Sequence, residues 1–423
     1  MVVVGLVGVL LVLWMLGAAS SDPPRLVTPP DFRVTDATQQ GRMIIEDHEA
    51  WIAAGTDPGQ GTRWADMSYW ALRDIKALSG HGPLPPAGAA EQWNYFWPRD
   101  GAFAAVAMDR TGHPDEARQI LDAMSTLPFD DALGFDARYT LAGNTVVDRP
   151  RGPQSDGCAW TLWAIGSVRA HGETPLPPSA EELRDRCVAH LRQLTDDGQI
   201  LPPASPDYWE VDVSDVSLGT VAPMAAGLDA AADDYRASGD TKQAISTSTA
   251  ADDLRALIDD QFGPDYERFG NNGGIDAAIT FLMPPFAAPN PQVVRRWSAY
   301  QREAIRPAGG LAPGAEWEQD GISWTPETAL VAYTAASSGR YEVAAQWLDW
   351  LDAQRTSWGS LPEKVNGDGL PAGPAPLLWT DALVLLTLDE LHGPSPPDGA
   401  HRVHSTVDDF GPLLRPAPGS RVS

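Results

Sequence analysis

Helical periodicity recurs along most of this chain and restricts the possible folds more than any other feature. Met67, Ala71, Ile75 and Leu78 are spaced as one apolar face of a helix. Similar faces begin near Ala117, Leu183, Val221, Leu254, Val343 and Asp381. The intervening segments are rich in Gly and Pro, whereas the alternating Val, Ile and Thr runs that are typical of strands are scarce. The sequence therefore predicts an all-α protein.

The number of helices indicates how they are arranged. Roughly a dozen helix candidates occur in the chain, with uncertain boundaries. Helix pairs that recur over so long a chain favour a closed α/α toroid over a short bundle, and their spacing is too irregular for a regular solenoid. Ser179 and Glu182 predict a capping box at the start of one helix. We expect the helical domain to span residues 41–393.

Both ends of the chain differ from this helical region. Residues 1–20 are predominantly apolar and predict a signal peptide or an uncleaved membrane anchor, although no basic residue precedes Arg25. Residues 21–40 predict a linker, and the Pro- and Gly-rich residues 394–423 predict a mobile tail. The alternative is a segment that packs back onto the body through Val407 or Leu413–Leu414. We therefore expect an extracytoplasmic protein that is secreted or membrane-anchored through its N-terminal segment.

The charge of the chain excludes several classes of partner. Acidic residues number 57 against 30 basic ones, which gives a formal net charge of −27. Such a charge opposes binding to nucleic acid or to anionic lipid, and it is compatible with an uncharged substrate such as a glycan. The 16 Trp residues are numerous, and Trp lines carbohydrate sites as well as protein cores. We expect a carbohydrate partner, and the oligomeric state stays open.

The two cysteines, Cys158 and Cys187, leave two interpretations open. They could form a disulfide in an exported protein, or they could be two buried thiols on neighbouring helices. No Cys or His pattern predicts a zinc site, so no metal and no cofactor is expected, although loop carboxylates leave a bound calcium ion possible.

Polar and aromatic clusters lie between the predicted helices. In Trp93–Asp100, Arg99 and Asp100 supply donors and acceptors for sugar hydroxyls, and Trp97 supplies a ring face; a structural salt bridge with core aromatics is the alternative. In Arg149–Gly157, Gln154 and Asp156 suit hydroxyl recognition, although Asp156 alone could be a helix cap. Another cluster, Glu316–Trp324, suits an outer sugar subsite or a solvated acidic loop.

Two glutamates stand out as acid and base candidates. Glu210 follows Tyr208 and Trp209, and apolar neighbours raise the pKa of a carboxyl, as a general acid requires; a helix-start carboxylate is the alternative. Glu363 lies outside any helical stripe and is a candidate base, unless it only pairs with Lys364. Glycoside hydrolysis needs two carboxyl groups that flank the bond to be broken.

The motifs resemble glycoside hydrolase family 15, the glucoamylase-like enzymes. Trp97-Pro-Arg99-Asp100 resembles the Trp-x-Arg-Asp signature of that family, and residues 152–157 resemble its Pro-Gln-x-Asp-Gly loop. Trp209-Glu210 matches its Trp-Glu motif, Glu363 in Leu-Pro-Glu-Lys matches its second catalytic Glu, and residues 378–380 are similar to the Trp-Ser run that follows. The motifs occur in the order of the family, and the resemblance covers about residues 64–391.

The resemblance implies an (α/α)6 barrel and exo-acting, inverting release of glucose from non-reducing ends. It implies that Glu210 is the general acid and Glu363 the general base. The residues that it implies for substrate binding are Trp97, Arg99, Asp100, Gln154, Asp156, Trp209 and Trp379.

Two departures concern the region where the leaving sugar would bind. Val211 occupies the place of a second acidic residue of starch-active fungal members, and Gly309–Trp324 lacks their recognisable Arg-bearing segment. Neither a starch-binding module nor an N-terminal β-sandwich is evident. The linkage and the chain-length preference therefore stay open. A trehalase-like or other α-glycosidase on the same fold, or a glycan-binding protein without activity, is the alternative.

Overall fold

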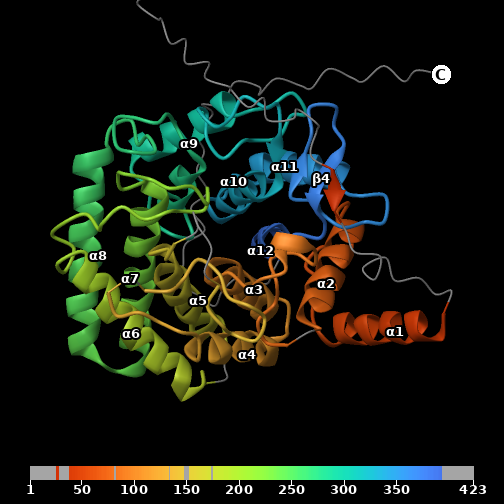
Figure 1. The fold of residues 1–423 in the computed structure, drawn as a ribbon, viewed down its shortest axis with the longest axis horizontal. Coiled ribbons are helices and arrows are strands. Elements are labelled where there is room, and N and C mark those ends of the chain that lie inside the picture. The colour runs from red at the N-terminus through yellow and green to blue at the C-terminus, as the bar shows by residue number, and fades with distance from the viewer. Residues whose placement is uncertain are drawn as a thin grey trace, which may run out of the picture.

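Two concentric layers of helices make up the body of the protein (Figure 1). The computed structural model describes residues 25–27, 38–80, 82–132, 134–146, 152–172 and 175–392. The inner layer consists of α3 (Pro98–Arg110), α5 (Asp156–His171), α7 (Leu218–Ser238), the 3₁₀ helix η3 (Ala277–Leu282), α10 (Thr325–Ser337) and α12 (Leu378–His392). Each of these elements contacts the next, and α12 contacts α3, so the inner layer is a closed ring.

Every inner element has an outer partner. The outer helices are α4 (Pro114–Ser125), α6 (Pro178–Leu194), α8 (Thr241–Phe262), α9 (Pro291–Glu303), α11 (Tyr341–Ala353) and α2 (Ala65–Ser79). They pack on α3, α5, α7, η3, α10 and α12 in that order. The arrangement is the (α/α)6 barrel that the family resemblance implies. A further helix, α1 (Gln39–Ala54), packs beside α2 at the periphery (Figure 1).

The two layers differ in how their residues are buried. In the outer helix α4 the buried residues are Ala117, Ile120, Leu121 and Met124, which form the predicted apolar face. In the inner helix α10 every residue from Thr325 to Ala336 is buried, because the helix packs on all sides. A stripe therefore marks the outer helix α4 in the sequence, whereas the inner helix α10 shows none.

Small residues let the inner helices α5 and α7 approach each other closely. A Cβ atom on Gly227 would lie 2.5 Å from the carbonyl oxygen of Ala159, and one on Gly166 would lie 2.9 Å from that of Ala230. Real Cβ atoms do not approach backbone oxygens so closely, so these two positions require glycine.

A small sheet lies beside the helices. Its strands are β1 (Leu26–Val27), β2 (Ser323–Trp324), β3 (Lys364–Val365) and β4 (Pro371–Pro374), in the order β1-β4-β3-β2. β1 runs parallel to β4, and the other two pairs are antiparallel. Residues 25–27 of the predicted linker thus pair with the body of the protein.

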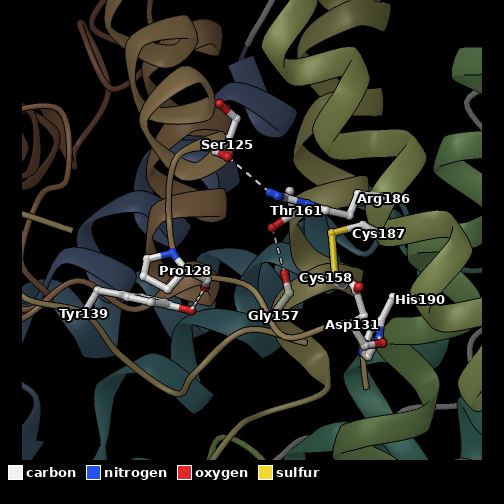
Figure 2. The surroundings of a disulfide bond; sticks show 10 residues. All are labelled: Ser125, Pro128, Asp131, Tyr139, Gly157, Cys158, Thr161, Arg186, Cys187 and His190. Atoms are coloured by element: carbon white, nitrogen blue, oxygen red, sulfur yellow. Dashed lines mark hydrogen bonds between the residues drawn. A yellow bond between two sulfur atoms is a disulfide. The ribbon is translucent and has the colours of Figure 1, made fainter. Parts of the chain in front are cut away.

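The two cysteines form a disulfide between an inner helix and its outer partner (Figure 2). Cys158 lies in the first turn of α5 and Cys187 lies on α6, and both are buried. Nearby, Arg186 donates a hydrogen bond to the carbonyl oxygen of Ser125, which ties α6 to α4 (Figure 2). Of the two interpretations that the sequence leaves open, the structure has the disulfide.

One local prediction is wrong. The helix α6 begins at Pro178 with Pro177 as its N-cap, and Ser179 does not cap it. The Ser179 hydroxyl instead donates a 2.5 Å hydrogen bond to Asp122 Oδ1 on α4. The helix has already begun at Pro178, so Ser179 lies inside it and its hydroxyl bonds a neighbouring helix.

The predicted signal peptide or anchor, residues 1–20, and the predicted tail, residues 394–423, lie outside the described residues. Within the part of the chain that is described, none of the helices combines the length and the apolar character needed to cross a bilayer.

Candidate active site

Glu210 is the last residue of a tight turn between α6 and α7. The Glu210 N–H donates a 2.9 Å hydrogen bond to the carbonyl oxygen of Asp207, and the φ angle of Glu210 is +58°. This left-handed conformation is uncommon for a residue other than glycine, and it persists only where the surroundings enforce it. The turn must therefore be held from outside.

A buried charge network holds this turn. Arg268 donates to Asp207 Oδ1 at 2.8 Å and to Asp276 Oδ2 at 3.2 Å, and its guanidinium lies 3.5 Å from the ring centroid of Trp209. The Tyr208 hydroxyl donates to Asp276 Oδ1. Every residue between Asp207 and Trp209 is thus fixed by a partner from the Arg268–Asp276 segment, which fixes the direction of Glu210.

The Glu210 carboxylate meets two of the predicted binding residues. Arg99 Nη2 lies 3.1 Å and Gln154 Nε2 lies 2.8 Å from Glu210 Oε1, and both donate to it. Arg99 Nη1 also donates to Asp156 Oδ2 at 2.5 Å. Burial opposes the charge of Arg99, but the carboxylates of Asp156, Glu210 and Asp100 outweigh it and raise the pKa of the guanidinium. The positive charge of Arg99 therefore holds Asp156 and Glu210 together.

Pro98 at the start of α3 explains the placement of Arg99 and Asp100. The proline fixes the first helical position, so both residues lie in the first turn of α3 and are almost fully buried. Burial raises the pKa of Asp100 to about 7, although the Arg99 charge opposes this. Asp100 therefore holds a proton in slightly acidic solution and can donate a hydrogen bond.

Glu363 immediately precedes β3, and the sheet positions it. Its N–H donates to the carbonyl oxygen of Pro374 on β4 at 2.8 Å, and its carbonyl oxygen accepts from the N–H of Thr325 at 3.0 Å. The side chain of Glu363 has two further contacts. Trp93 Nε1 donates to Glu363 Oε1 at 3.0 Å, and Lys364 Nζ lies 3.1 Å from Glu363 Oε2. Each carboxylate oxygen therefore has one fixed neighbour.

Glu210 and Glu363 line the same cavity, which has a volume of about 240 Å³. The other predicted site residues that line it are Trp97, Arg99, Asp100, Trp209 and Trp379. Gln154 and Asp156 do not line it but lie behind Arg99 and Glu210 as hydrogen-bond partners. A second hollow of about 570 Å³, beside Trp70 and Arg355, contains none of the predicted site residues.

The structure adds residues that the sequence did not identify as part of the site. Trp93 precedes the Trp97 motif, and Glu327 lies in the first turn of α10; neither was predicted to have a role. The rings of Trp317 and Trp324 pack edge to face with centroids 5.7 Å apart and form part of the cavity wall, in the stretch considered for an outer subsite. In that stretch Glu316 and Glu318 are exposed.

The described residues offer no group of three or more His, Cys, Asp or Glu side chains that could hold a metal ion. The side chains that line the cavity include carboxyl groups, the cations of Arg99 and Lys364, and indole rings.

Solved structures share the fold. A glycosidase variant is 21% identical, covers 78% of this chain and 97% of its own, and has a TM-score of 0.67. A bacterial glucoamylase complexed with acarbose is 17% identical, covering 82% of this chain and 58% of its own with a TM-score of 0.66. The glucoamylase of Saccharomycopsis fibuligera is 14% identical, covering 88% and 98% with a TM-score of 0.60.

No family model matches the sequence. No curated protein matches it either. The likeness is therefore one of structure, and it confirms the (α/α)6 barrel and the glucoamylase-like resemblance at the level of the fold.

Proposed function

We propose that the protein is a glycoside hydrolase that removes glucose from the non-reducing ends of α-linked saccharides with inversion of configuration. The observation that carries the proposal is that Glu210 and Glu363, far apart in the chain, line one cavity together with Arg99 and Asp100. Two carboxyl groups at one sugar-sized site are the minimum that glycoside hydrolysis requires.

The reaction follows from assigning one role to each glutamate. Glu210 gives its proton to the glycosidic oxygen as the bond between that oxygen and the anomeric carbon breaks. A water molecule forms the new bond to the anomeric carbon from the opposite face, and its proton passes to Glu363. The products are a free sugar of inverted configuration and a shortened saccharide.

The contacts of the two carboxyl groups hold both of them in place at the cavity. Arg99 and Gln154 both donate to Oε1 of Glu210, which fixes the orientation of the carboxyl group. The indole of Trp93 and the ammonium group of Lys364 fix the orientation of the Glu363 carboxylate. Trp97 and Trp379 offer indole faces in the cavity, which suit a sugar ring.

The choice of glucose rests on the structural neighbours. One of the glycosidase structures was solved in complex with glucose, and the bacterial glucoamylase structure contains acarbose. Together with the terminal-sugar motif Arg99-Asp100, this supports a glucosyl unit at the non-reducing end as the substrate.

The decisive experiment measures glucose release by the purified protein. The substrates are maltose, isomaltose, trehalose, nigerose and soluble dextrin, and the variants are Glu210→Gln and Glu363→Gln. Glu342→Gln on α11, an exposed position, is the matched control. We expect release from at least one substrate, loss of at least about 1000-fold in either site variant, and full activity in the control.

Two results would contradict the proposal. Absence of hydrolysis of every substrate, or equal activity in wild type and Glu363→Gln, would remove the enzymatic role. NMR of the first product tests inversion: an α-linked substrate should give the β-anomer first, and initial α-anomer contradicts the mechanism.

We also propose that the protein is exported. The disulfide between Cys158 and Cys187 supports this, because disulfides persist in oxidising compartments. Cell fractionation combined with N-terminal sequencing of the natural protein tests it. Protein in the cytoplasmic fraction with both thiols reduced contradicts it, whereas a new N-terminus after the apolar segment indicates a cleaved signal peptide.

A further inference from the structure

Glu327 is a third glutamate in the cavity, and the mechanism above does not use it. It lies in the first turn of α10 and lines the cavity together with Glu363 and Lys364. The residue is 3% exposed, and its Oε2 atom has no hydrogen-bond partner among the described residues. A buried polar atom without a partner is unfavourable, so a partner from outside the protein is a natural explanation.

The rest of α10 shows that an acid at this position is not needed for packing. The other residues of the helix carry no charge, and every residue from Thr325 to Ala336 is buried. An apolar side chain of similar size would fill the same space without the cost of burying a carboxyl group. The glutamate therefore reduces stability at a place where it faces the site, a combination that is typical of functional residues.

The surroundings of Glu327 determine its protonation. Burial raises the pKa of its carboxyl to about 8, and the charges of Glu363 and Asp276 add to this effect, whereas its own backbone N–H and Lys364 oppose it. At neutral pH the group is therefore mainly a neutral carboxylic acid. Such an acid has one donor and one or more acceptors, which matches a sugar hydroxyl that also donates and accepts.

We propose that Glu327 hydrogen-bonds one hydroxyl group of the sugar in the cavity and thereby selects which hexose is accepted. This assignment rests on the proposed function, since it requires a sugar in the cavity. A site that hydrogen-bonds a substrate hydroxyl discriminates strongly against an analogue that lacks it. Glu327 is then a specificity-determining residue, distinct from the acid and the base.

The test measures binding and does not depend on turnover. Glucose and its 2-, 3-, 4- and 6-deoxy analogues are titrated against wild type, Glu327→Leu and Glu327→Gln, with the fluorescence of the cavity tryptophans as the signal. We expect Glu327→Leu to weaken glucose binding by about 10- to 100-fold. Glu327→Gln keeps a donor and an acceptor and should lose less than about 10-fold.

The deoxy analogues identify the contact. For one of them, wild type and Glu327→Leu should bind almost equally, because the hydroxyl that Glu327 contacts is already absent. For the other three, the loss in Glu327→Leu should be as large as it is for glucose. An equal loss for glucose and all four analogues, or no loss for any of them, overturns the proposal.

A control separates recognition from structure. Glu342 lies in the first turn of the neighbouring helix α11 and is exposed, so Glu342→Leu reports the effect of losing a helix-terminal carboxylate. We expect Glu327→Leu to melt at the same temperature as wild type or higher, whereas a structural role predicts a lower melting temperature.

The binding data also separate this proposal from the proposed function. Wild-type protein that binds glucose but hydrolyses nothing refutes the proposed function alone. Wild-type protein that binds none of these sugars refutes both proposals.

Discussion

Replacement of Asp381 by asparagine should make the folded protein less sensitive to rising pH. Asp381 on α12 and Asp74 on α2 are 0% and 4% exposed. Both carboxylate oxygens of Asp381 and Oδ2 of Asp74 lack a hydrogen-bond partner among the described residues. Burial raises the pKa of Asp74 to about 7, and burial together with the nearby Asp74 raises the pKa of Asp381 well above its ordinary value.

The magnitude follows from proton linkage. In the unfolded chain an aspartate loses its proton near pH 4, whereas folded Asp381 keeps its proton far above that pH. The folded state then binds more protons than the unfolded state, so the free energy of unfolding falls as the pH rises. One retained proton amounts to about 1.4 kcal/mol per pH unit, or about 3 kcal/mol between pH 5 and pH 7.

The assay compares urea unfolding of wild type and Asp381→Asn at pH 5 and pH 7, followed by tryptophan fluorescence. Asparagine has nearly the same shape and no proton to lose, so the stability of the variant relative to wild type should rise by about 3 kcal/mol between the two pH values. Asp368→Asn, at an exposed position, is the control and should show no such rise. A rise below about 1 kcal/mol would mean that Asp381 is ionised in the folded protein and would refute the reasoning.

Three further perturbations probe the site and its supports. Gly373 has a φ of +72°, and a Cβ atom there would lie 2.8 Å from Glu363 Oε2. Gly373→Ala should therefore lower kcat by at least about 10-fold while the circular dichroism spectrum stays the same. An unchanged kcat contradicts this prediction. Loss of the disulfide in a Cys158→Ser/Cys187→Ser variant should lower the free energy of unfolding by about 3–4 kcal/mol, given the sequence separation of 29. Urea unfolding measures this difference. A difference near zero argues against the bond. A truncation of residues 1–27 deletes the two backbone hydrogen bonds that Gly373 and Ala375 donate to Arg25 and Val27. It should therefore melt several degrees below a truncation of residues 1–24. Equal melting temperatures in scanning calorimetry contradict this.

The sequence predicts the outer layer of the barrel far better than the inner one. Met67, Ala71, Ile75 and Leu78 form the buried face of α2 as their spacing indicates. The inner helix α10 has no polar face, so periodicity provides no signal for it, and the helix was not predicted. The strands are too short to show alternation, and tertiary packing alone explains them.

Residue types and their order in the sequence predict the main residues of the site. They do not predict the residues that hold those side chains in place. Arg99, Glu210 and Glu363 lie in motifs that stand apart from helical stripes, and the structure brings all three to one cavity. Glu327 was not predicted as a site residue because a Glu after Thr-Pro is common in the first turn of a helix. The contact between Trp93 and Glu363 joins segments that only the closed ring brings together, so no local pattern could predict it.

The closed ring also has a consequence for how the protein is made. Its last inner helix, α12, packs against both α2 and α3. While α12 is still inside the ribosome, the barrel lacks one wall, and the apolar inner helices beside the gap are uncovered. Incomplete chains that expose such surfaces are prone to aggregate. We therefore expect a nascent chain that depends on chaperones until α12 has left the ribosome, and a site that forms only in the final step of folding.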